Sequence, residues 1–154
     1  MGFCRSKIGF TQWLILVIMG TASMLAVSSM AKTIMVGGSE GWHFGFNYTD
    51  WAFENGPFYL NDTLVFKFDP PNSTTFPHSV YLLRDFWSFL RCDLKKDKMV
   101  ANVTDGGGEG FKFVLKRWQP YYFSCGERNG FHCNVGRMKF VVFPMPRCRN
   151  STHG

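Results

Sequence analysis

The sequence lacks most of the short motifs that mark enzymes and nucleic-acid-binding proteins. Its 154 residues contain no His-Glu-x-x-His zinc helix and no Walker-type phosphate loop. The formal net charge of +6 comes from scattered Lys and Arg, and no nucleic-acid-binding motif accompanies them, so nucleic acid is not an expected partner. Only four histidines are present, too few for a multicopper oxidase. The sequence has no internal repeat, and a strong helical pattern occurs only near the N-terminus.

The N-terminal part of the chain has the features of a secretory leader. Arg5 and Lys7 precede an apolar stretch at 13–27. The triplet Ser29-Met30-Ala31 then supplies the small residues that a signal peptidase recognises. We therefore predict a signal peptide at 1–31. An uncleaved membrane anchor is the alternative, but the apolar stretch is short for a membrane-spanning helix.

The rest of the chain is long enough for one domain, which we expect at 32–146. The tail at 147–154 is polar and therefore carries no signal for a C-terminal lipid anchor. Five Asn-x-Ser/Thr sequons support a glycoprotein that is secreted to the cell surface or wall. They are Asn47, Asn61, Asn72, Asn102 and Asn150.

Short strand-like runs dominate this domain. In 63–68, Leu64, Phe66 and Phe68 alternate with other side chains, a period-2 pattern typical of a strand. Further apolar runs lie at 33–36, 78–83, 111–115, 121–124 and 138–143. Because Gly, Pro and Asn separate these runs, they predict an all-β Greek-key sandwich or barrel. The one expected helical or irregular excursion lies around 84–98.

Four potential soft metal donors lie close together in the sequence. Cys125, His132, Cys133 and Met138 fall within fourteen residues. Thiolate, imidazole and thioether together suit copper better than other common metals. His78, at the start of a separate strand-like run, is the candidate for a further ligand. His43, in a glycine-rich loop, is expected to be a surface or packing residue.

The cysteines allow two interpretations. After removal of the leader, four remain: Cys92, Cys125, Cys133 and Cys148. In an oxidising compartment these would form two structural disulfides with any of three connectivities. The alternative is one disulfide, one thiolate kept for a metal, and one cysteine left over.

Four motifs spread over most of the mature chain resemble the phytocyanins, a plant subgroup of the cupredoxins. They are VGGSEGW at 36–42, HSV at 78–80, YYFSCG at 121–126 and GFHCNVG at 130–136. The resemblance implies a cupredoxin-like fold and one type 1 copper held by His78, Cys125 and His132. It also implies a disulfide between Cys92 and Cys133.

Two features depart from the family pattern. Six residues separate Cys125 from His132, a longer segment than is usual in the family. The position of the family's weak axial ligand holds Arg137, whose guanidinium stays protonated and does not bind metal. Met138 follows it, and a one-residue shift on a strand turns a side chain to the opposite face. We therefore expect Met138 as the axial ligand only if the loop absorbs the extra residue.

The resemblance and the soft donors together predict a secreted blue copper protein that carries single electrons, not an enzyme. An unknown redox partner would dock against an exposed edge of His132, and a monomer is expected. The alternative is a copper-free, cupredoxin-like glycoprotein that binds a wall polysaccharide or another extracellular protein. Pairing of Cys125 with Cys148 would produce that outcome. A catalytic copper oxidoreductase is a third, less favoured reading.

Overall fold

A computed structural model describes residues 30–147. Residues 1–29 of the predicted leader lie outside this range, as do Cys148 and the sequon at Asn150. Within it, no helix is both long enough and apolar enough to cross a membrane.

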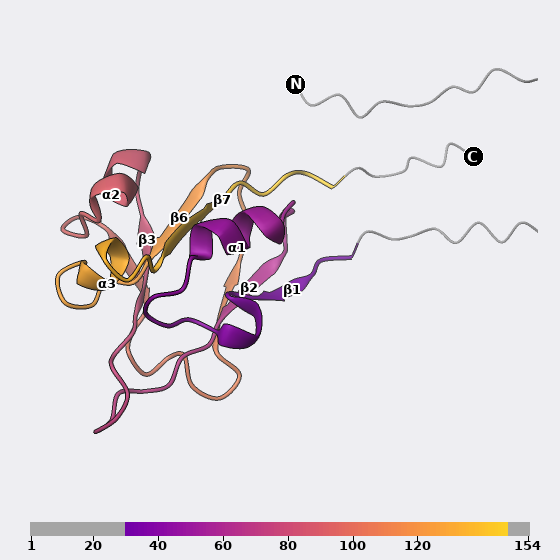
Figure 1. Cartoon of the computed structure of the whole chain (residues 1–154). Helices are drawn as coiled ribbons and strands as arrows, with labels where there is room; N and C mark the ends of the chain where they lie inside the picture. Colours follow the sequence, from indigo (N-terminus) through magenta and orange to yellow (C-terminus); the bar gives the residue numbers. More distant parts are fainter. Residues whose placement is uncertain (1–29, 148–154) are drawn as a thin grey trace, which may run out of the picture. The chain divides into compact units, whose positions relative to one another are not determined.

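Within residues 30–147, seven short strands form two sheets, and Figure 1 shows their arrangement. The three-stranded sheet has the order β1 (Thr33–Met35), β2 (Thr63–Phe66) and β5 (Phe111–Val114). The four-stranded sheet has the order β4 (Lys98–Ala101), β3 (Val80–Leu83), β6 (Tyr121–Ser124) and β7 (Lys139–Val142). Only β1 and β2 pair in parallel; every other named strand pair is antiparallel. The expected all-β architecture is confirmed, as an open two-sheet arrangement and not a closed barrel.

Aromatic side chains join the two sheets into one core. Phe66 of β2 contacts Phe123 of β6 and Phe140 of β7, with ring centroids 5.2 and 6.0 Å apart. Trp42, outside the strands, packs against Phe66 at 5.3 Å. The Trp42 indole also donates a hydrogen bond to the carbonyl of Ser79 at 3.1 Å. This network fixes the start of β3 to the core.

Helical structure is more dispersed than the sequence indicated. The segment 84–98 is helical only in α2 (Phe86–Arg91), where the side chain of Asp85 caps the N-terminus. Cys92 then ends the helix in a left-handed conformation with φ of 51°, and strand β4 begins at Lys98. Two further helices, α1 (Tyr48–Glu54) and α3 (Phe131–Asn134), accompany a 3-10 turn, η1 (Gly38–Glu40).

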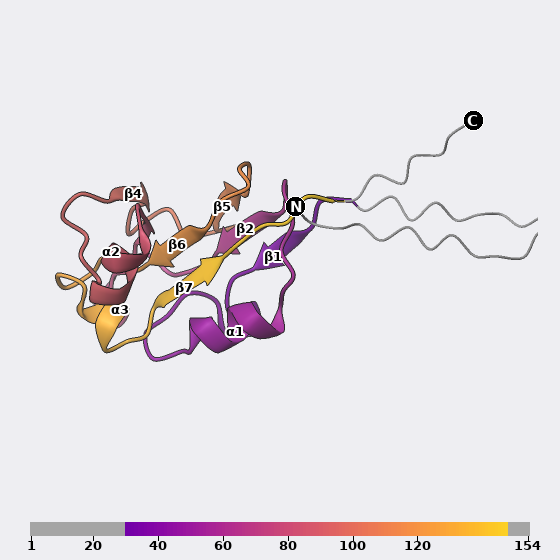
Figure 2. The same ribbon diagram turned by 90° about the horizontal axis from the view of Figure 1, so that it is seen from above.

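The helices occupy two places on the sheets. Helix α1 lies beside β7, and Asn47 caps it by accepting a hydrogen bond from the Asp50 amide (Figure 2). Helices α2 and α3 lie next to each other at one end of the domain in both views. That end carries the candidate site.

Candidate metal centre

The antiparallel order of three strands brings the candidate ligands together. Strand β6 is antiparallel to both β3 and β7. Therefore the start of β3, the end of β6 and the start of β7 meet at the same end of the four-stranded sheet. His78 precedes β3, Cys125 follows β6, and Met138 precedes β7. His132 lies in α3, within the connection from β6 to β7.

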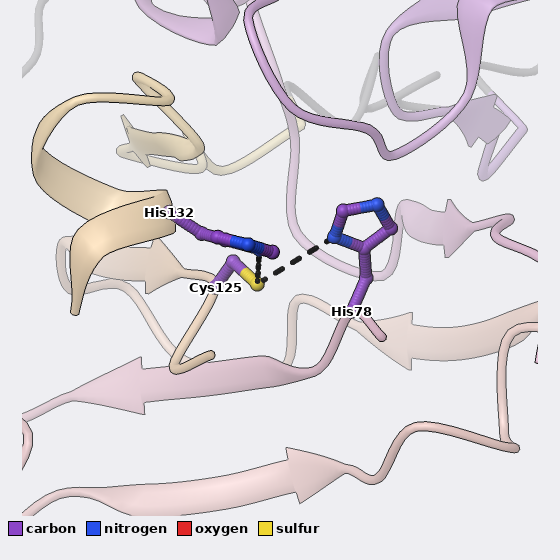
Figure 3. A group of neighbouring side chains, drawn as sticks. All are labelled: His78, Cys125 and His132. Carbon is purple, nitrogen blue, oxygen red and sulfur yellow. Dashed lines mark hydrogen bonds between the residues drawn. The ribbon is translucent and has the colours of Figure 1, made fainter. Parts of the chain in front are cut away.

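Three donor side chains converge at this end (Figure 3). The Cys125 sulfur lies 3.6 Å from Nδ1 of His132 and 4.0 Å from Nδ1 of His78. One donor atom from each of the three residues falls within 4.8 Å of the others, and all three residues are buried. In the part of the chain that the structure describes, this is the one group of three or more His, Cys, Asp or Glu residues with such geometry.

These separations suit a single metal ion. With metal–nitrogen and metal–sulfur bonds of about 2.0 and 2.3 Å, as in zinc sites, a trigonal arrangement places the donor atoms about 3.7 Å apart. The two observed sulfur–nitrogen distances, 3.6 and 4.0 Å, bracket that value. Two imidazoles and one thiolate are the donor set of a blue copper site. The residues present therefore fit copper in both geometry and chemistry.

Burial keeps the three groups uncharged at neutral pH. It raises the pKa of the Cys125 thiol to about 11. Burial, together with the nearby His132 and His43, lowers the pKa of His78 to about 4. Burial also lowers the pKa of His132, which Arg128 reinforces and Glu127 opposes. Because both imidazoles are neutral, their ring nitrogens have lone pairs available, and a metal cation meets no positive charge from these ligands.

Met138 is part of the buried core. Arg137 adopts a left-handed conformation with φ of 54° and is exposed, whereas Met138 is fully buried. The Met138 amide donates to the carbonyl of His132 at 3.0 Å, and the Met138 carbonyl accepts from the Cys125 amide at 2.9 Å. The role of Met138 as axial ligand stays a prediction.

A disulfide ties the loop that carries His132 to the rest of the domain. Cys92 at the end of α2 is bonded to Cys133 of α3, with Cα atoms 5.9 Å apart, as the resemblance implied. The long segment before α3 turns through left-handed Arg128 and Asn129, with φ of 51° and 52°. Gly130 continues the turn at φ of 82°, where a Cβ would lie only 2.9 Å from the Cys92 carbonyl oxygen. The longer loop bulges outward and leaves His132 beside Cys125.

Two aromatic side chains cover His132, which corrects the expectation of an exposed imidazole edge. Phe44 makes an edge-to-face contact with the His132 ring at 5.3 Å and stacks on Phe131 at 5.8 Å. Only 3% of the His132 surface is exposed, whereas both phenylalanines are partly exposed. Sequence reasoning did not identify Phe44 because its contact with His132 is long-range and belongs to no motif.

The other predicted positions lie apart from this site. Cys125 is free and buried, so it forms no second disulfide with a residue in 30–147. His43 is not part of the three-residue donor group. Among the sequons, Asn61, Asn72 and Asn102 are exposed and Asn47 is half-buried. Their glycosylation remains a prediction.

Comparisons with known proteins agree with this geometry. No family model matches the chain. Blue copper proteins 1a and 1b of Medicago truncatula are each 29% identical to it, over 123 and 124 residues, which is 78% of this chain and 67% of each relative. The solved structure of Cu2+ cucumber stellacyanin aligns over 77% of this chain and all of that chain, with a TM-score of 0.59 and 25% identity. Spinach plantacyanin aligns over 75% of this chain with a TM-score of 0.48 and 21% identity.

Proposed function

We propose that the chain is a phytocyanin of the cupredoxins, which binds one type 1 copper and carries single electrons. The observation that carries the proposal is the convergence of one buried thiol and two buried, neutral imidazoles, with sulfur–nitrogen distances of 3.6 and 4.0 Å. Cys125 supplies the sulfur, and His78 and His132 supply their Nδ1 atoms. When bound, copper alternates between Cu(II) and Cu(I) and so supplies one-electron chemistry.

The protein's contribution is a rigid holder for these ligands. His78 is held by its position directly before β3. The Cys125 amide donates a hydrogen bond to the carbonyl of Met138. His132 is held in α3, which the disulfide at Cys133 ties to Cys92. A holder that changes little between oxidation states lowers the cost of passing an electron, because the preorganised ligands need not rearrange.

The copper-free alternative rested on the longer loop before His132, on Arg137 in the axial position and on pairing of Cys125 with Cys148. Within 30–147, His132 Nδ1 lies 3.6 Å from the Cys125 sulfur, and Cys125 is free. The blue copper protein is therefore the better-supported function.

We also propose that the protein is secreted and glycosylated, is not an enzyme, and exchanges electrons with a protein partner at the aromatic cover of His132. The cover consists of Phe44 and Phe131, and the exposed Val135 adds apolar surface from the residue directly after α3. The leader-like N-terminus and the sequons support secretion. A partner that packs against Phe131 would contact a ring whose centroid lies 6.5 Å from that of the His132 ring.

A copper titration tests the proposed function. Protein expressed from the full chain in a secretory host is stripped of metal and titrated with Cu(II), while visible absorption is recorded. We expect an intense blue thiolate-to-copper band that saturates at one equivalent and disappears in Cys125→Ser. His43→Gln is the matched control for His78→Gln: the first should keep the band and the second should weaken or abolish it. Absence of the band in the native chain would contradict the proposal.

A further inference from the structure

We propose that a cleft beside His78 binds a small uncharged phenol, which delivers its electron to the metal centre through His78. This inference rests on the proposed copper function and assigns one class of electron donor to that site. It gives the two histidines different tasks: His78 faces a small-molecule cleft, and His132 lies under an aromatic cover suited to a protein partner.

The cleft has the size of a small-molecule site. Its volume is about 550 Å³, within the usual range of 300–1,000 Å³. Its walls come from the turn at η1, from the segment after β2, and from the loop that leads into β3. His78 is one of the lining residues, whereas Cys125, His132, Phe44 and Phe131 are not. A bound molecule would therefore contact the metal centre through His78.

The walls are held in place before any ligand binds. The Trp42 amide donates to the carbonyl of Lys67 at 2.8 Å, and its indole donates to the carbonyl of Ser79 at 3.1 Å. Gly41 permits this close approach, since a Cβ there would lie 2.8 Å from the Lys67 carbonyl oxygen. On the facing side, the hydroxyl of Thr75 donates to the carbonyl of Pro70 at 2.9 Å. A preformed cleft lowers the entropic cost of binding.

The lining favours an aromatic ring. Phe68, a buried wall residue, meets the His78 ring edge to face at 6.5 Å. Phe76 also lines the cleft, and 62% of its surface is exposed. A planar ligand in the cleft can stack on Phe76, and offset or edge-to-face aromatic contacts are favourable.

The charges of the lining favour an uncharged ligand with a hydroxyl group. Glu40 and Asp69 supply carboxylate acceptors, which suit an O–H donor. Lys67 lines the same cleft, and the Arg128 guanidinium lies 5.3 Å from the centre of the Phe76 ring. Charges of both signs therefore lie at or near the cleft. An ordinary phenol is uncharged at neutral pH, since its pKa is about 10.

The electron transfer balances as a one-electron oxidation of the phenol. With copper bound, the O–H bond of the phenol would break, its proton would go to the carboxylate of Glu40, and one electron would pass by way of His78 to Cu(II). The products would be a phenoxyl radical and Cu(I).

Binding is tested in the Cu(I) form, which phenol cannot reduce further. The copper-loaded protein is reduced, kept under argon and titrated with 4-methylphenol, and NMR chemical shifts report the dissociation constant. We expect saturable shifts at cleft residues. Phe76→Ala and Glu40→Gln should each weaken binding about fivefold. Phe53→Ala and Glu54→Gln, on the exposed face of α1, are matched controls that should leave the dissociation constant unchanged. The methyl ether of the probe, 4-methylanisole, should bind more weakly than the phenol.

The outcomes separate this inference from the proposed function. If the blue band forms but the phenol causes no saturable shifts, or if the cleft variants bind as tightly as the controls, the inference is wrong and the copper function stands. If no blue band forms, the same titration on metal-free protein still measures phenol binding in the cleft. Saturable binding that weakens in Phe76→Ala would then support the binding site and contradict the electron-transfer step. The rate at which 4-methylphenol bleaches the Cu(II) band should fall in Phe76→Ala and not in Phe53→Ala.

Discussion

The domain contains two contrasting groups of buried polar side chains. At one, Asp62 is fully buried, and its carboxylate accepts from the amides of Lys32 and Tyr59 at 2.8 and 2.9 Å and pairs with Arg147. At the other, the imidazole nitrogens of His78 and His132 face the sulfur of Cys125 at 4.0 and 3.6 Å.

The contrast separates a structural polar site from a ligand site. The Asp62 carboxylate is surrounded by donors, so it has no need of an external ligand and serves to join chain segments that are distant in sequence. The donor atoms of His78, Cys125 and His132 instead lie within 4.8 Å of one another. A metal ion completes that group, whereas nothing has to be added to the Asp62 group.

Removing Asp62 should have the largest effect on stability. Asp62→Ala removes the buried carboxylate that pairs with Arg147 and accepts from two backbone amides. Breaking a buried pair in this way typically costs about 3–5 kcal/mol. Urea unfolding of the metal-free protein measures the loss, with the exposed Glu54→Ala as control. The blue band of the folded, copper-loaded variant should be unchanged. A loss below about 1 kcal/mol would contradict the structural role of this site.

Removing the disulfide should affect both stability and copper affinity. Cys92→Ala combined with Cys133→Ala should lower the free energy of unfolding by about 2–4 kcal/mol. Because α3 carries both Cys133 and His132, copper affinity should also fall, unlike in Asp62→Ala. Competition with a Cu(II) chelator measures that affinity. Unchanged affinity in a destabilised double variant would show that the bridge does not position His132.

Copper binding should release one proton. Burial raises the pKa of the Cys125 thiol to about 11, so the thiol is protonated at neutral pH and must lose its proton to bind. The pKa of His78 is lowered to about 4 and that of His132 also lies below its ordinary value, so neither imidazole adds a proton above about pH 7. Affinity should therefore rise about tenfold per pH unit between about pH 7 and 9.

Calorimetry in buffers of different ionisation enthalpy counts the released protons directly. Cys125→Ser should release none. Release of about two or three protons from the native protein would mean that the imidazoles are charged before copper binds, against the burial argument.

Replacing Met138 should give the smallest change in stability and a diagnostic change in potential. Met138→Leu conserves volume in the core and should cost less than about 1.5 kcal/mol. If the thioether is the axial ligand, its loss withdraws electron donation from Cu(II), and the reduction potential rises. Cyclic voltammetry measures the potential, with Val142→Leu on β7 as a core control. An unchanged reduction potential in Met138→Leu would show that Met138 is not a copper ligand.

Local patterns predicted the sheet positions that hold ligands and the chemistry of those ligands. The period-2 run of β2 and the apolar run of β6 followed directly from alternation and burial, and His78, Cys125 and His132 followed from motifs at strand ends. Strand β4 was missed because Lys98–Ala101 is mostly exposed or half-buried and shows no alternation. The sequence does not distinguish a helix from a strand at α1, since seven residues are too few to establish a helical period.

The remaining features depend on long-range contacts or on unusual backbone conformations. The left-handed conformation of Arg137, which turns Met138 inward, is uncommon for residues other than glycine and is set by the surrounding loop. The cover over His132 requires Phe44, which is placed there by folding of the whole domain. The cleft beside His78 likewise forms from three separate segments.

X-ray absorption at the copper edge of the loaded protein tests the central claim most directly, because it reports the atoms bound to the metal. We predict one short sulfur bond of about 2.2–2.3 Å and two nitrogen bonds of about 2.0 Å, with the sulfur lost in Cys125→Ser. A first shell made only of nitrogen and oxygen in the native protein would contradict the account, because Cys125 would then not be a ligand.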